Sequence, residues 1–225
     1  FEPTAGTVPF PFDGLFSGFT DPTLNIPQTA APALDANRTD GFSTTGNIFT
    51  DFIGFLDFET TAEGLLVFEL PEGAAPRRLE QGVDYSVSDY PATSATPATG
   101  GTTIDCQPDG SNRAPISCVR TRLLISPLKP LRPSTRHVVI ATDALRDVNG
   151  NAAVPSTQFR IIRRTTPVQQ QDDPTVVAMS EPVRTTLATL QSSLIGPVLQ
   201  GVIQITGLPR DRIVLAWPFT TQSIG

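Results

Sequence analysis

Histidine, cysteine and lysine are scarce in this sequence, which has one histidine, two cysteines and a single lysine, Lys129, among 225 residues. One histidine and two cysteines are too few for an ordinary zinc site, so we expect no zinc chemistry. Acidic residues outnumber basic ones by 22 to 16, giving a net charge of -6 at pH 7. That sign opposes binding to a phosphate backbone, and the arginines are too scattered for a basic membrane patch. We therefore expect no nucleic-acid partner.

The sequence motifs of common enzyme classes are also missing. A Gly-x-Ser-x-Gly pentapeptide, which places the serine nucleophile of an α/β-hydrolase on a strained turn, does not occur. The nearest string, Gly41–Gly46, has its second glycine one residue too late. A glycine-rich phosphate loop and a dinucleotide fingerprint are absent, so we expect no cofactor. We therefore predict no catalytic, cofactor-binding or metal-binding residue, and we assign the many carboxylates to the surface.

Long apolar runs are absent as well. The longest mostly apolar stretch, Leu194–Ile205, is interrupted by glycine and proline and is shorter than the roughly 20 residues that cross a bilayer. We therefore expect no transmembrane segment. The chain opens with Phe1-Glu2-Pro3 rather than with a charged region and an apolar leader, so we expect any export signal to lie upstream or to have been removed.

Turn-forming residues, by contrast, are abundant. The 22 prolines and 17 glycines divide the chain into short runs rich in β-branched and aromatic residues, which is typical of a mainly β fold. Seven such runs suit a β-sandwich. The predicted strands are Ile48–Ile53, Leu65–Leu70, Tyr85–Ser88, Arg120–Ile125, His137–Thr142, Thr157–Ile162 and Ile213–Thr220. Because Val138–Ile140 is continuously apolar, we expect the strand that contains it to be central and covered on both faces.

One region breaks the β pattern and predicts a small helical insertion near residues 180–205. Ser180 can cap a helix whose apolar residues, Val183, Leu187, Leu190 and Leu194, form one stripe. Gly196-Pro197 should end or kink this helix, and Pro197 can begin a second one through about Gln204. We expect the stripe to pack on its own domain, although it can also bind a lipid chain or a partner helix.

The segment Asp147–Asn151 contains Asn-Gly between two strand-like runs and is predicted to be a tight turn. A calcium loop is the alternative, because Asp147, Asn149 and Asn151 stand at alternate positions. An EF-hand, however, needs glycine where Ala152 stands and a bidentate glutamate where Gln158 stands. We therefore reject an EF-hand here.

Both cysteines lie in a long polar stretch, Asp89–Pro115 and the residues just after it, which we predict to be a surface loop. Cys106 and Cys118 close a thirteen-residue segment, and a disulfide between them would stabilise the fold by about 3 kcal/mol on the loop-entropy model. We favour this disulfide, while two free surface thiols remain the alternative.

Phenylalanine accounts for thirteen of the sixteen aromatic residues and gathers in two groups, around residues 10–19 and 49–58. We expect most of these rings to lie in the core, because each buries about 150 Å² or more. The alternative is that loop rings, namely Phe12, Phe16 and Phe19, dock onto lipid or onto another domain. His137 is expected to be an ordinary strand residue. A hydrolase using His137 with Ser134 or Ser126 is a further alternative.

Several strings, in order along nearly the whole chain, together resemble one protein family. They are Val8–Asp13, Thr23–Pro27, Asp40–Thr45, Gly82–Tyr85, Pro127–Leu131, Asp147–Asn151 and Phe219–Ser223. The family is the N-terminal domain of bacterial virulence-factor lipases, which are exported or surface-anchored lipoproteins. In that family the catalytic α/β-hydrolase domain, with lipase or lysophospholipase activity, lies downstream of the last string, and the middle of the N-terminal region is similar to bacterial Ig-like domains.

The resemblance implies a single elaborated Ig-like β-sandwich domain over residues 1–225, with core strands at about 48–162 and 213–221. It implies a noncatalytic accessory domain that supports or positions the hydrolase domain of the same polypeptide, secreted or held at the cell surface, with an anchoring lipid upstream. Export would place Cys106 and Cys118 in an oxidising compartment. The alternatives are a lipid- or cell-surface-binding module, a lid or intramolecular chaperone for the hydrolase, and a hydrolase with an unrecognised site.

Overall fold

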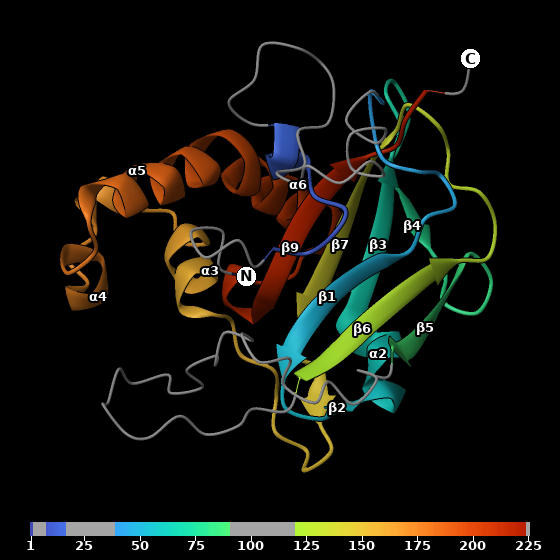
Figure 1. Ribbon diagram of the computed structural model, residues 1–225, viewed down its shortest axis with the longest axis horizontal. Helices are drawn as coiled ribbons and strands as arrows, with labels where there is room; N and C mark the ends of the chain where they lie inside the picture. The colour runs from blue at the N-terminus through green and yellow to red at the C-terminus, as the bar shows by residue number, and fades with distance from the viewer. Residues whose placement is uncertain (2–7, 17–38, 91–119, 224–225) are drawn as a thin grey trace, which may run out of the picture.

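Two antiparallel sheets form the framework of the computed structural model, which describes residues 1, 8–16, 39–90 and 120–223 (Figure 1). One sheet has the strand order β4-β3-β7-β9 and the other the order β1-β6-β5, while β2 and β8 pair separately. The strands are β1 (Ile48–Ile53), β2 (Leu56–Asp57), β3 (Leu65–Leu70), β4 (Arg77–Leu79), β5 (Tyr85–Tyr90), β6 (Arg120–Pro127), β7 (Arg136–Thr142), β8 (Arg146–Asp147) and β9 (Ile213–Thr220). Six of the seven predicted strands are thereby confirmed.

The three-stranded sheet is buried on one face only, as its alternating sequence indicates. In β6, Leu123 and Ile125 are fully buried, whereas Arg122 and Leu124, which alternate with them, are half-buried. Successive strand residues point to opposite faces, so the buried residues share the face that covers the core. Figure 1 shows this sheet lying over the four-stranded sheet, and residues of both belong to one core cluster.

The four-stranded sheet is buried on both faces, which confirms the expectation from Val138–Ile140. Val139 pairs with Trp217, and both are fully buried on the face toward the three-stranded sheet. The next position, Val138, pairs with Phe68 and faces the helical layer. Continuous apolar runs are therefore required in β7 and β9, because neither face meets water.

Helices occupy most of residues 157–206 and make the fold more helical than the sequence predicted. The α-helices are α2 (Thr61–Gly64), α3 (Thr157–Ile162), α4 (Pro174–Val177), α5 (Glu181–Leu190) and α6 (Gly196–Thr206), and α5 is joined to α6 by the π-helical turn η5 (Gln191–Ile195). Single-turn 3-10 helices are η2 (Asp13–Phe16), η3 (Phe58–Thr60), η4 (Val168–Gln170) and η6 (Arg210–Arg212).

The predicted strand Thr157–Ile162 is wrong, because this segment forms helix α3. Ser156 lies just before it in extended conformation, and its hydroxyl accepts a hydrogen bond from the Phe159 N–H, as an N-cap does. Phe159, Ile161 and Ile162 are all fully buried. A helix capped in this way buries the same apolar residues that suggested a strand.

The predicted helix beginning after Ser180 is confirmed, but it does not end at Gly196-Pro197. Since Pro197 has no N–H to donate, the backbone widens into a π turn in which the Gly196 N–H bonds to the carbonyl of Gln191. The buried Gln191 side chain fixes this turn by accepting from the Val168 N–H and donating to backbone carbonyls of the segment before η4. The helix ends at Gly207, whose φ is 69°.

The continuous helix Glu181–Thr206 is long and apolar enough to cross a membrane by length and composition. Its inward residues, among them Leu187, Leu199 and Val202, are buried in the same core as the sheets. Core helices of soluble domains pass the same test, so this helix is weak evidence for a membrane span. The expected absence of a transmembrane segment stays a prediction.

We predict opposite effects for two glycine-to-alanine substitutions in α6. A Cβ atom at position 196 would overlap the carbonyl oxygen of Gln191, whereas a Cβ atom at position 201 meets nothing within 4 Å. Gly196→Ala should lower the free energy of unfolding by about 1–3 kcal/mol, because the π turn must shift. Gly201→Ala should raise it by roughly 0.5–1 kcal/mol through helix propensity. Urea unfolding curves measure both, and equal effects would contradict the tight packing at Gly196.

Candidate functional site

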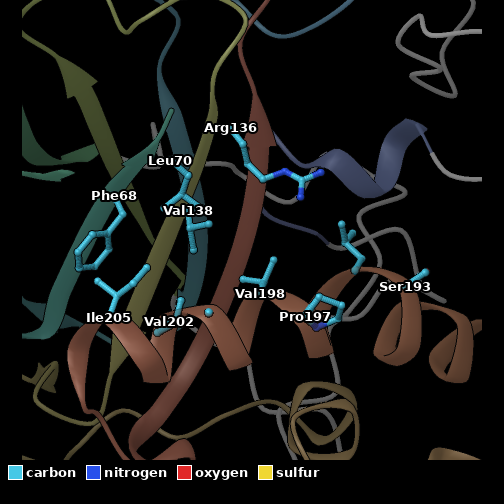
Figure 2. Close-up of a pocket in the computed structure, with 11 residues that line it drawn as sticks. Phe68, Leu70, Arg136, Val138, Ser193, Pro197, Val198, Val202 and Ile205 are labelled. Atoms are coloured by element: carbon cyan, nitrogen blue, oxygen red, sulfur yellow. The ribbon is translucent and has the colours of Figure 1, made fainter. Parts of the chain in front are cut away.

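A small groove lies between the four-stranded sheet and the continuous helix. It has a volume of about 150 Å³ and mostly apolar walls. In Figure 2, Phe68 and Val138 of the sheet face Val198 and Val202 of α6, and Arg136 lies at one end. The lining residues are Phe68, Leu70, Arg136, Val138, Ser193, Leu194, Pro197, Val198, Gly201, Val202 and Ile205. A cavity of this size accommodates one small apolar group, about as large as a benzene ring.

The polar end of this groove is built on an ion pair between strand β7 and the turn η2. The Arg136 guanidinium lies 3.5 Å from Oδ2 of Asp13, which also accepts a hydrogen bond of 3.0 Å from the Thr220 hydroxyl. Oδ1 of Asp13 is buried without a hydrogen-bond partner among the described residues. Burial raises the pKa of Asp13, although the Thr220 hydroxyl and Arg136 act in the opposite direction. The Arg136 side chain therefore forms an ion pair with Asp13 and is also 54% exposed to solvent.

His137 lies on the opposite face of β7 and is fully buried, which confirms its assignment as an ordinary strand residue. Its ring stacks on Phe219 at 5.1 Å, and Nδ1 lies 3.0 Å from the carbonyl oxygen of Thr135. A carbonyl only accepts, so Nδ1 carries the proton and Nε2 is the unprotonated nitrogen. Burial lowers the pKa of His137, which keeps the ring neutral.

Among the described residues, no serine hydroxyl bonds to this imidazole. Nε2 of His137 is buried and has no hydrogen-bond partner among the described residues. The Ser134 N–H donates to the carbonyl of Gln222, and the Ser126 carbonyl accepts from the Ser86 hydroxyl. A general base must reach its nucleophile within about 3 Å or through one water molecule. The hydrolase alternative therefore gains no support from His137, Ser134 or Ser126.

Of the three aromatic side chains proposed for docking, one lies in the core and two lie outside the described residues. Phe12 is only 2% exposed and packs edge-on against Phe1, which in turn packs against Phe159 of α3. Phe12 is therefore a core residue. The side chain of Phe16 and the whole of Phe19 lie outside the described residues. Docking through these two rings stays a prediction.

The turn predicted at Asp147–Asn151 is confirmed. Oδ1 of Asp147 accepts hydrogen bonds from the backbone N–H groups of Asn149 and Asn151, and Gly150 has a φ of 84°. Oδ2 accepts from the side-chain amide of Asn151, so these hydrogen bonds lower the pKa of Asp147. In the described part of the chain, no three histidine, cysteine, aspartate or glutamate side chains gather closely enough to hold a metal. Cys106 and Cys118 lie outside that part, so their disulfide stays a prediction.

The groove itself was not predicted from the sequence. One wall is the paired residues Phe68 of β3 and Val138 of β7, and the other wall is α6. These elements are far apart in the chain, and no local pattern shows that they face each other. Pro197 was interpreted only as the point where one helix ends or kinks and a second begins, and Arg136 only as the neighbour of His137. A glycine and a proline inside an otherwise continuous apolar stripe were the one available signal, because π turns are frequent at functional sites.

These observations define the protein as an antiparallel two-sheet domain covered by helices on one side. The family described as bacterial virulence factor lipase N-terminal matches residues 3–225, so the chain belongs to that family. The resemblance found in the sequence is thereby confirmed. No curated protein matches the chain.

The buried histidine predicts a specific dependence of stability on pH. Because burial lowers its pKa below the ordinary 6.5, the unfolded chain binds a proton below that pH which the folded chain does not. The free energy of unfolding therefore falls as the pH drops from 7 towards 5. The advantage of the native protein over His137→Gln should shrink over this range in urea unfolding experiments. Since His137 is the only histidine, its ring proton in NMR spectra provides the check, and a folded-state midpoint at 6.5 would contradict burial.

Asp13 predicts a change of opposite sign. Its raised pKa means that folding favours the protonated carboxyl, so its contribution to stability is lost as the pH rises from about 4 through the folded pKa. Asp13→Asn resembles the protonated form and keeps an acceptor for the Thr220 hydroxyl. The variant should gain stability relative to the native protein between pH 4 and pH 7. Thermal unfolding at both values measures this gain, and a relative loss at pH 7 would show that the Arg136 ion pair outweighs burial.

Proposed function

We propose that this chain is the noncatalytic N-terminal accessory domain of an exported or surface-held lipase or lysophospholipase, which it supports and positions. The observation that carries the proposal is the match of one lipase N-terminal family to residues 3–225. The parent enzyme's chemistry then belongs to an α/β-hydrolase domain of the same polypeptide. In this proposal the protein is secreted or bound to the cell surface through a lipid.

The absence of paired catalytic groups in the described chain supports the noncatalytic part of this proposal. The single imidazole has no hydroxyl partner among these described residues, and its lowered pKa makes it a weak base. The groove beside Arg136 presents apolar side chains and an ion pair, which suit contact with another protein surface better than chemistry.

We further propose that the two sheets form an Ig-like sandwich. The division into four and three antiparallel strands and the buried Trp217 between the sheets support this assignment. Helix α6 on the outer face of the four-stranded sheet is then the elaboration of that sandwich.

The position of the last strand supports a contact between the groove and the hydrolase domain. Thr220, the last residue of β9, pairs with Arg136 at the mouth of the groove. A domain attached after β9 therefore starts beside this groove. Arg136, with its side chain 54% exposed, is the residue that we expect to meet it.

Hydrolysis of p-nitrophenyl esters and of lysophospholipids tests the proposal. We expect no turnover by this chain alone, and no change on His137→Ala. We expect activity in the full-length gene product, and a loss of about tenfold or more when residues 1–225 are deleted, because catalytic geometry tolerates little displacement.

Each remaining outcome excludes one part of the proposal. Equal activity and equal melting temperature of the truncated and full-length proteins would exclude a supporting role. Turnover by the isolated chain that disappears in His137→Ala would assign the activity to this domain instead.

A further inference from the structure

Large exposed apolar side chains gather at one end of the domain. In the described part of the chain eight such residues are exposed, and four of them lie in or beside two neighbouring loops, Ile53 at the end of β1 and Phe55 just after it, and Val148 and Val154 after β8. We call these four the apolar tip: Ile53 (64% exposed), Phe55 (59%), Val148 (61%) and Val154 (78%). The two loops are joined, because β2 pairs with β8 and the Val148 N–H donates to the Phe55 carbonyl at 3.0 Å.

Hydrogen bonds within the domain hold the loops of the apolar tip in place. Gly54 has a φ of 99°, and its carbonyl accepts a hydrogen bond of 2.6 Å from the buried Thr121 side chain. The same Thr121 oxygen accepts from the Leu56 N–H. In the second loop, Oδ1 of Asp147 accepts hydrogen bonds from the backbone N–H groups of Asn149 and Asn151, which follow Val148. The exposed side chains are therefore presented by a fixed backbone, which lowers the entropic cost of binding through them.

The size of the apolar tip argues against a stable protein interface. Four side chains at these exposures amount to a few hundred Å² of surface, which is within the range of functional apolar patches. A stable dimer buries about 800 Å² on each partner, so the tip is too small to hold a second copy alone. Protruding apolar side chains on turns instead suit a fluid apolar phase, which closes around each one.

The charges beside the apolar tip favour a lipid surface without net charge. Asp51 in β1 pairs with Arg122 through both carboxylate oxygens, the shorter contact being 2.7 Å, and both carboxylate oxygens of Asp147 are bonded within its own turn. Arg122 neutralises the charge of Asp51, whereas Asp147 keeps its negative charge, because its hydrogen-bond partners are uncharged amides, and that charge disfavours an anionic surface. The net charge of -6 disfavours approach to an anionic surface. A zwitterionic headgroup layer meets neither obstacle.

The apolar tip also lies far from the last residue of β9. β8 follows Thr142, which pairs with Ile213 at the start of β9, so the tip and Thr220 are at opposite ends of the four-stranded sheet (Figure 1). A domain joined after β9 therefore starts at the end of this sheet that is remote from the tip. We propose that the apolar tip inserts into the interfacial layer of zwitterionic phosphocholine lipids and docks the domain there.

Flotation of this chain with phosphatidylcholine vesicles tests the proposal. We expect binding by the native protein and a loss of about tenfold or more in Ile53→Ser/Phe55→Ser, because each buried apolar side chain contributes strongly. The matched control is Val83→Ser/Leu128→Ser, which removes two apolar residues of 50% and 53% exposure beyond the opposite end of β6. The control should bind as the native protein does. Urea unfolding of both variants verifies that they fold.

Phe55→Trp provides a direct readout. The only native tryptophan, Trp217, is fully buried, so a vesicle-dependent blue shift and quenching by brominated lipid would come from position 55. No flotation of the native protein, equal loss in the control variant, or a fluorescence change at position 55 that responds to protein concentration rather than to lipid would overturn the proposal. The assay needs no ester turnover, so its failure is distinct from failure of the accessory role.

Discussion

The pairing and hydrogen bonds of strand β9 hold the other parts of this domain together. The strand pairs with β7 along its whole length and carries Trp217 into the space between the sheets. Arg163, just after α3, donates to the Ile213 carbonyl at 2.7 Å. At the other end of β9, the Thr220 hydroxyl donates to Asp13, and the Thr220 carbonyl accepts from the Phe42 N–H. The four-stranded sheet, the residue after α3 and the segments that hold Asp13 and Phe42 therefore all meet at β9, the last strand of the described chain.

Much of the fold could be predicted because burial imposes periodicity on strands. Alternation in β6 and continuous apolar residues in β7 and β9 each indicated the correct element. The failure at Thr157–Ile162 has a physical cause, since its β-branched residues suit a strand and a buried helix equally well, and the Ser156 cap decides between them. At Gly196-Pro197 the helix does not end but passes through a π turn, and the buried Gln191 side chain ties this turn to the segment before η4.

The sites were less predictable than the fold, because exposure is a property of the assembled molecule. Phe12 and Phe55 look alike in the sequence, yet Phe12 packs on Phe1 in the core and Phe55 is 59% exposed on a turn. The apolar tip depends on the pairing of β2 with β8, two strands of two residues each that no periodicity shows. The groove likewise depends on the packing of α6 on the sheet. Only the turn at Asp147 could be located from local sequence.

The two ends of the four-stranded sheet carry different surfaces, and this difference suggests how the proposed accessory role would work. One end carries Arg136 and the groove, beside the last residue of β9, and the other carries the apolar tip. Eight extended residues span roughly 25 Å, so β9 is a rigid spacer between the two ends. An enzyme attached at the first end, with the tip inserted in a lipid layer, would be held at a fixed distance from its substrate surface. In the proposed arrangement, supporting a hydrolase and docking on lipid would be one function, because the four-stranded sheet would connect the end near the tip to the attached domain.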